Sequence, residues 1–97
     1  MDKPSLTIHV HFNSVLADYA STRQVDIKVP EGTTLEKFLK ILAGQFTTTF
    51  KQVEGDLGKR HSFVRIFRNG ELVSGENDQD LLKEGDDIRL FPAISGG

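Results

Sequence analysis

The stretch QVDIKVPEGTTLEKFLKILAG, residues 24–44, contains the change of pattern that decides the fold. Apolar and polar side chains alternate over residues 24–29, and a period of two is typical of a half-buried strand. After Pro30-Glu31-Gly32 the apolar side chains recur at helical spacing. This stripe consists of Leu35, Phe38, Leu39 and Leu42. The stretch therefore predicts a strand, a turn and one amphipathic helix.

The ends of this helix also carry sequence signals. Thr33 with Glu36 three residues later matches a capping box, which satisfies two free backbone donors at a helix start. Lys37 and Lys40 fall on the predicted solvent side. We expect the helix to end at or near Gly44.

Further alternating segments predict the rest of a sheet. One precedes the helix at residues 6–12, and the others follow it at residues 62–68, 71–73 and 87–91. Asn69-Gly70 separates two of them, and this pair favours a type I′ hairpin turn because both residues tolerate positive φ.

The connecting segments carry weaker signals. Residues 13–23 are predicted to be a loop, and residues 76–82 a single helical turn. Residues 45–61 fit either a short second helix or an ordered loop. The acidic pair Asp86-Asp87 is interpreted as part of a solvated turn.

The resulting order is β-β-α-β-β-β, an α+β domain in which a mixed sheet of four to five strands packs on one main helix. A length of 97 residues suits one domain, which we place at residues 1–92 with a flexible tail at residues 93–97.

Composition excludes several classes of function. The net charge of -2 gives no general attraction to nucleic acid or membrane, and no apolar run is long enough to span a bilayer. The chain has no cysteine, so thiolate metal sites and cysteine nucleophiles are excluded. Residues 1–4 lack the hydrophobic core of a signal peptide, and we expect a cytoplasmic protein.

The segment LKEGDDIRLFPAISGG, residues 82–97, has a turn, a last strand, a Phe-Pro step and a final Gly-Gly. Together with the element order and the helix after Pro30-Glu31-Gly32-Thr33, it resembles the ubiquitin-like β-grasp family. The resemblance is closest to the MoaD/ThiS branch of sulfur carriers, and within it to the small subunit of molybdopterin synthase.

This resemblance implies that the chain is a carried substrate and not a catalyst. A ubiquitin-activating-type partner would use ATP to adenylate the carboxylate of Gly97, and a sulfur donor would then form a thiocarboxylate. Gly96 would leave the backbone unhindered, with Ile94 and Ser95 lining the partner's channel. The sulfur acceptor would be the molybdopterin synthase large subunit. The chain itself is expected to bind no cofactor.

Three alternatives stay open. The activated Gly97 could be joined to lysines of target proteins, as in a ubiquitin-like modifier. The carrier could instead serve cysteine synthesis, thiamine synthesis or tRNA thiolation. The chain could also be an interaction module that never uses its tail.

Alternation also predicts an exposed sheet face opposite the helix. The residues predicted on it are His9, His11, Lys28, Phe63, Arg65, Phe67, Arg89 and Phe91. In the β-grasp strand order His9, Phe67, Arg89 and Phe91 would cluster. Aromatic side chains beside arginine are typical of protein interfaces, so we predict a docking surface that Pro92 continues toward the tail. The alternative is that residues 45–61 fold over this face.

His9 and His11 lie two residues apart on one strand face, a spacing that can suit zinc. No third ligand is evident, because His61 lies far along the chain. A polar strand face explains the two histidines better, so we predict no metal site.

Overall fold

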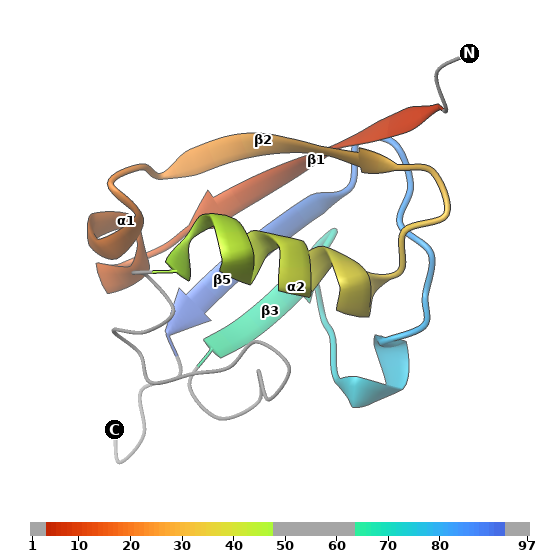
Figure 1. Ribbon diagram of the computed structural model, residues 1–97. Helices are drawn as coiled ribbons and strands as arrows, with labels where there is room; N and C mark the ends of the chain where they lie inside the picture. The colour runs from red at the N-terminus through yellow and green to blue at the C-terminus, as the bar shows by residue number, and fades with distance from the viewer. Residues whose placement is uncertain (1–3, 48–63, 93–97) are drawn as a thin grey trace.

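In the described residues, 4–47 and 64–92, five strands form one sheet and a helix lies across one of its faces (Figure 1). The strands are β1 (Ser5–Phe12), β2 (Gln24–Pro30), β3 (Val64–Arg68), β4 (Glu71–Leu72) and β5 (Asp87–Pro92). The helices are α1 (Val15–Ala20), α2 (Leu35–Gln45) and the 3-10 helix η2 (Gly75–Asn77). The strand order is β2-β1-β5-β3-β4, with β1 and β5 parallel and the other pairs antiparallel. The predicted mixed sheet on one main helix is confirmed.

The helix α2 buries the predicted apolar stripe against the sheet. Its four stripe residues are at most 1% exposed, whereas Lys37 and Lys40 face solvent. The facing side chains of the sheet are Ile8, Val10, Ile27, Val64, Ile66, Ile88 and Leu90, which are buried, and Val25, which is partly buried. Each fully buried apolar side chain contributes about 1.5–3 kcal/mol of transfer free energy. This shared core fixes which face of the sheet points away from α2.

The start of α2 differs from the prediction by one residue. Thr34 is the N-cap, and its hydroxyl oxygen accepts a hydrogen bond from the Lys37 amide at 3.2 Å. The hydroxyl of Thr33 instead donates to the Pro30 carbonyl at 2.6 Å and closes the preceding turn. Because Thr33 is committed to that turn, the predicted capping box with Glu36 is wrong.

At its other end α2 runs through Gly44 to Gln45. The amide of Phe46 donates to the Leu42 carbonyl and caps this end. The ring of Phe46 packs on Phe12 with the ring centroids 4.9 Å apart. Phe46 therefore ties the end of the helix to β1.

The prediction of a loop over residues 13–23 is wrong, because these residues include α1. Ser14 starts the helix with a φ of 57° and gives no side-chain cap. A helix of six residues is not stable through its own hydrogen bonds. It is held because Leu16 is fully buried and Tyr19 and Ala20 pack against the core. Leu16, Tyr19 and Ala20 are spaced three and four residues apart, which is helical spacing.

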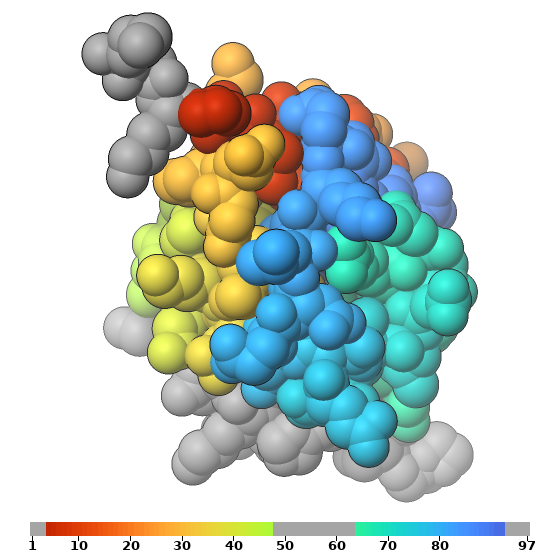
Figure 2. Space-filling model, turned by 90° about the vertical axis from the view of Figure 1, so that its right-hand side faces the viewer, coloured from red at the N-terminus to blue at the C-terminus, as the bar shows by residue number. Residues whose placement is uncertain are grey.

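The predicted hairpin turn is confirmed, with Asn69 and Gly70 at φ values of 51° and 88°. The helical turn predicted within residues 76–82 is the 3-10 helix η2, which begins one residue earlier. Figure 2 shows the chain after η2 running between the start of α2 and the β3–β4 hairpin. Leu82 on this segment is buried, whereas Leu81 is 57% exposed.

The predictions for residues 48–61, for residues 62–63 of the third strand and for the tail at 93–97 lie outside the described residues. In the part of the chain that the structure describes, no helix is long and apolar enough to cross a membrane.

Candidate docking face

The side of the sheet away from α2 is a continuous face built by β1, β5 and β3. Strand alternation places Arg65 and Phe67 of β3 on it, beside Arg89 and Phe91 of β5. The antiparallel register pairs Arg65 with Phe91 and Phe67 with Arg89. In each of these two pairs a phenylalanine on one strand lies opposite an arginine on the other.

The two aromatic rings contact each other on this face. The ring centroids of Phe67 and Phe91 are 5.4 Å apart and the ring planes meet at 86°, an edge-to-face arrangement. Both residues remain partly exposed. They lie in a hollow of about 680 Å³. The hollow is lined by Arg65, Phe67, Asn69, Gly70, Asp87, Arg89 and Phe91.

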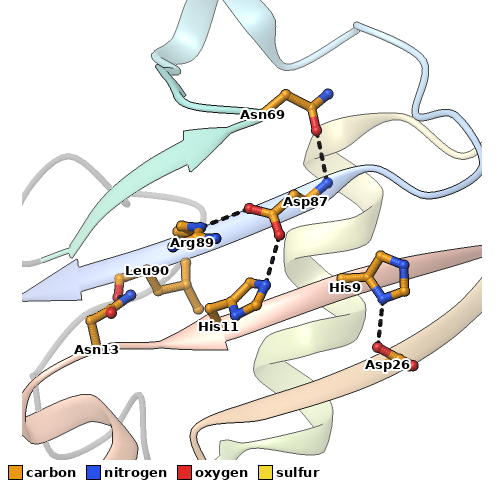
Figure 3. Close-up of polar contacts among 8 residues, drawn as sticks. All are labelled: His9, His11, Asn13, Asp26, Asn69, Asp87, Arg89 and Leu90. Carbon is orange, nitrogen blue, oxygen red and sulfur yellow. Dashed lines mark hydrogen bonds and ion pairs between the residues drawn. The ribbon is translucent and has the colours of Figure 1, made fainter.

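A hydrogen-bonded carboxylate, that of Asp87 at the start of β5, belongs to this lining (Figure 3). Oδ1 of Asp87 is 2.7 Å from Nε2 of His11, and Oδ2 accepts a bond from Nε of Arg89 at 2.8 Å. The Asp87 amide donates to Oδ1 of Asn69. Burial raises the pKa of Asp87, but the bonds from Arg89 and His11 outweigh it and lower the pKa below 3.8. The Asp87 charge is thus compensated within the face.

His9 lies on the same face but bonds away from the hollow. Its Nδ1 is 2.7 Å from Oδ1 of Asp26 on the outer strand β2 (Figure 3). The hydrogen bond to Asp26 is the main cause that raises the pKa of His9 above 6.5. His9 and His11 therefore bond to two different carboxylates. Among residues 4–47 and 64–92 no group of three or more His, Cys, Asp or Glu side chains is placed to hold a metal ion.

Arg65 differs from the other charged groups of the hollow. Its side chain is exposed, and no hydrogen bond or ion pair joins it to another described residue. Arg89 uses its Nε on Asp87, while its side chain is 50% exposed. The hollow thus combines apolar ring surface with positive charge that the described residues leave uncompensated.

On the core side of β3, Arg68 makes the opposite kind of contact. Its Nη2 lies 2.7 Å from Oδ2 of Asp86, and the two side chains are only 17% and 7% exposed. The Asp86 carboxylate also accepts bonds from Asn69 Nδ2 and the Lys83 amide. Burial raises the pKa of Asp86, but these bonds outweigh it and lower the pKa. The interpretation of Asp86 as solvated turn chemistry is therefore wrong.

The predicted site residues divide into three sets. The first set, Phe67, Arg89 and Phe91, lines the hollow. The second set lies outside the lining: His9 is beside the hollow, and Pro92 ends β5 opposite Val64. The other predicted residues, Phe63, Ile94, Ser95, Gly96 and Gly97, lie outside the described residues.

Sequence reasoning missed the contribution of Asn69 and Asp87 to the hollow. Asn69 had been assigned only to the turn. Its amide also bridges Asp86 and Asp87, which the sequence places 17 and 18 residues away.

Two curated proteins are similar to this chain over most of their length. Small archaeal modifier protein 1 of Haloferax volcanii is 34% identical over 83 residues, which cover 84% of this chain and 91% of that protein. The molybdopterin synthase sulfur carrier subunit of Drosophila melanogaster is 28% identical over 96 residues, covering 99% and 97% of the two chains.

Solved structures confirm the ubiquitin-like β-grasp fold. The crystal structure of SAMP1 from Haloferax volcanii superposes with a TM-score of 0.76 at 28% identity, covering 94% of this chain and 99% of that one. A chain in the complex of subunits 1 and 2 of the molybdopterin-converting factor from Helicobacter pylori gives a TM-score of 0.63 at 25% identity, covering 95% and 100%. The ThiS family model matches residues 10–97. This match spans most of the sequence, and the chain belongs to the ThiS family.

Proposed function

We propose that this chain is a sulfur carrier whose Gly97 carboxylate is adenylated by a partner enzyme and converted to a thiocarboxylate. The favoured role is the small subunit of molybdopterin synthase, which delivers this sulfur to a pterin precursor on the large subunit. The observation that carries the proposal is the extent of the family match, which runs from residue 10 through Gly97. It therefore includes Gly96-Gly97.

The chemistry requires activation because a carboxylate is a poor acyl donor. An oxygen of the Gly97 carboxylate attacks the α-phosphorus of ATP, and pyrophosphate leaves. Sulfide then adds to the carbonyl carbon, the bond to the AMP oxygen breaks, and a thiocarboxylate and AMP result. The partner supplies the ATP site, so this chain serves as the acyl substrate.

The position of β5 suits this role. Strand β5 lies between β1 and β3, and the structure describes it as far as Pro92. Five residues follow Pro92 in the sequence, and five extended residues reach at most about 17 Å. Gly96 and Gly97 have no Cβ atom, which suits passage through a narrow channel. A partner docked on the sheet face would thus receive Gly97 at a separate reaction site.

The proposed partners are an adenylating enzyme and the molybdopterin synthase large subunit. The structure of the two-subunit complex from Helicobacter pylori supports the second of these by analogy. We further propose a cytoplasmic location, with which the absence of cysteine is compatible.

A second candidate function is protein modification. The 34% identity to small archaeal modifier protein 1 favours it. In that reaction a lysine amine of a target attacks the same acyl adenylate, AMP leaves, and an amide bond forms. Both functions share the adenylated Gly97 and differ only in the nucleophile.

Intact-mass measurement separates these functions. The chain is incubated with an adenylating enzyme, ATP and sulfide, with a reaction lacking ATP as the control. A mass increase equal to the difference between sulfur and oxygen, absent when Gly97 is deleted, supports the carrier. Larger conjugates that also require Gly97 support the modifier. An unchanged mass, with an enzyme proven active on another carrier, would contradict the carrier. The absence of conjugates when a protein extract that offers target lysines is added would contradict the modifier.

A further inference from the structure

We propose that Asn69 is the site of a spontaneous modification, the loss of its side-chain amide as ammonia, and that the folded turn suppresses this reaction. Of the three asparagines in the sequence, at positions 13, 69 and 77, only Asn69 is followed by glycine. Glycine has no Cβ atom to shield its backbone nitrogen, so that nitrogen can reach the preceding side chain. This reaction lies outside the proposed function, because it concerns how long the chain keeps its folded structure.

The reaction consumes water and no other reagent. The backbone nitrogen of Gly70 attacks Cγ of Asn69, the bond from Cγ to Nδ2 breaks, and ammonia leaves with the proton of the Gly70 amide. Water then opens the cyclic imide that results. Breaking the ring bond to Cγ gives aspartate in an unaltered backbone. Breaking the ring bond to the backbone carbonyl carbon gives isoaspartate, in which the chain continues through the side chain.

Solvent reaches the turn in which this dipeptide lies. Asn69 and Gly70 are both exposed. Beyond its two chain neighbours, no atom would lie within 4 Å of a Cβ placed on Gly70. Burial therefore does not protect the dipeptide from water, and protection has to come from the orientation of the Asn69 side chain.

The side-chain amide of Asn69 is held against the start of β5 at both of its polar atoms. Nδ2 donates to Oδ1 of Asp86 at 3.0 Å, and Oδ1 accepts from the Asp87 amide at 2.9 Å, the bond drawn in Figure 3. The backbone amide of Asn69 also donates to the Asp87 carbonyl, at 2.8 Å. Bringing Cγ to the Gly70 nitrogen requires rotation of the side chain, which breaks both side-chain bonds. The reaction is therefore open only to molecules in which this contact has opened.

The products cannot remake the contact with Asp86. The Asp86 side chain is only 7% exposed, and its Oδ2 already accepts a bond from Arg68. An aspartate at position 69 has no hydrogen to donate to Oδ1, and it brings a second negative charge to a site where 3.0 Å now separates donor and acceptor. Isoaspartate also lengthens the backbone of the β3–β4 turn. Either product therefore separates this turn from the start of β5.

The test follows the ageing of the wild-type chain in mildly alkaline buffer, folded and in urea. Trypsin cleaves after Arg68 and Lys83 and releases residues 69–83, which contain both Asn69 and Asn77. Fragment masses then report the replacement of NH2 by OH at each position. In urea we expect Asn69 to convert at least ~10-fold faster than Asn77, whose following residue has a Cβ atom. Folding should slow the conversion of Asn69 at least ~10-fold.

Two variants separate the local contact from global stability. Asp86→Ala removes the acceptor of Nδ2, whereas Leu16→Ala leaves the partners of the turn in place and opens a cavity in the core beside α1. Urea denaturation establishes that both variants are folded in buffer and compares their free energies of unfolding. In the folded chains we expect Asn69 to convert at least ~5-fold faster in Asp86→Ala than in Leu16→Ala.

Equal rates for Asn69 in folded and urea-unfolded wild type would overturn the proposal, and this comparison needs no variant. Conversion of Asn77 as fast as that of Asn69 in urea would also overturn it, as would equal rates in the two folded variants. Asn69→Asp has the sequence of the first product and should unfold at a lower urea concentration than the wild type. An unchanged midpoint would contradict the separation of the turn from β5. None of these measurements involves Gly97 or a partner, so their outcome is independent of the proposed function.

Discussion

Two arginines three residues apart on β3 have opposite surroundings. Arg68 faces the core side, where Asp86 and the Leu81 carbonyl accept its hydrogen bonds. Arg65 faces solvent on the other side of the sheet, with no ion-pair partner among the described residues. Because strand alternation separates them, one strand carries both a structural cation and a candidate binding cation.

The comparison separates stability from recognition. Around Asp86 each charge is satisfied internally, which leaves little for a partner to bind. Around Arg65 the ring surface of Phe67 and Phe91 is partly exposed, and no charged group in residues 4–47 and 64–92 forms an ion pair with the guanidinium. An incoming protein can supply a carboxylate for Arg65 and an apolar side chain that covers the two rings.

The largest expected difference is in stability. Arg68→Ala would leave the Asp86 carboxylate buried without its charge partner, and we expect it to lower the free energy of unfolding by about 3 kcal/mol. Arg65→Ala should change it by less than about 0.5 kcal/mol, as for most exposed positions. Urea denaturation of the two variants measures both values. Similar losses would break the distinction between the two arginines.

Asn69→Gly sharpens the comparison at the residue that joins the two regions. Glycine accepts the φ of 51° at this position but removes the amide that contacts Asp86 and Asp87. We expect a loss of about 1–2 kcal/mol in the same urea assay. An unchanged stability would show that the turn conformation alone matters here.

The pH dependence of stability should trace mainly to the buried side of β3. Folding lowers the pKa of Asp86 from 3.8. The ionised carboxylate therefore stabilises the fold fully at pH values well above 3.8, and this contribution is lost as the pH falls through the folded pKa. Unfolding measured from pH 7 downward should show a smaller acid-dependent loss in Asp86→Asn than in the wild type. If the free energy of unfolding falls equally with pH in the two chains, the acid sensitivity comes from groups other than Asp86.

The smallest expected effect is local to the exposed face. The hydrogen bond to Asp26 raises the pKa of His9, so NMR titration should find it above 6.5 in the wild type. In Asp26→Asn it should return toward 6.5, because the hydrogen bond that raises it is weakened. A raised pKa that survives this substitution would mean that Asp26 is not the cause. Any stability from this pair is present below pH 6.5 and lost as pH rises through the folded pKa.

Much of this arrangement could be predicted from local patterns. The alternation in residues 6–12 and 87–91 set which side chains face the helix, and Asn69-Gly70 located the hairpin. These features depend on neighbours in sequence, where period and turn chemistry are informative. The clustering of Phe67, Arg89 and Phe91 followed once the strand order was assumed.

What could not be predicted depends on distant residues. α1 exists because Leu16 enters the core, and no cap at Ser14 announces it. Asp86 was interpreted as solvated because it lies in an acidic pair at a turn, yet Arg68 reaches it from 18 residues away. Burial of a charged side chain is decided by such tertiary partners and not by its own sequence neighbours.

The central claim is that the sheet face binds the partner while Gly97 reacts. Its most direct test is the initial rate of Gly97 thiocarboxylate formation at increasing concentrations of wild-type and Arg65→Glu chains. The account predicts a KM for the carrier at least ~10-fold higher in the variant, with kcat within about twofold, because docking and chemistry are separate. A lower kcat at unchanged KM, or identical kinetics, would contradict it.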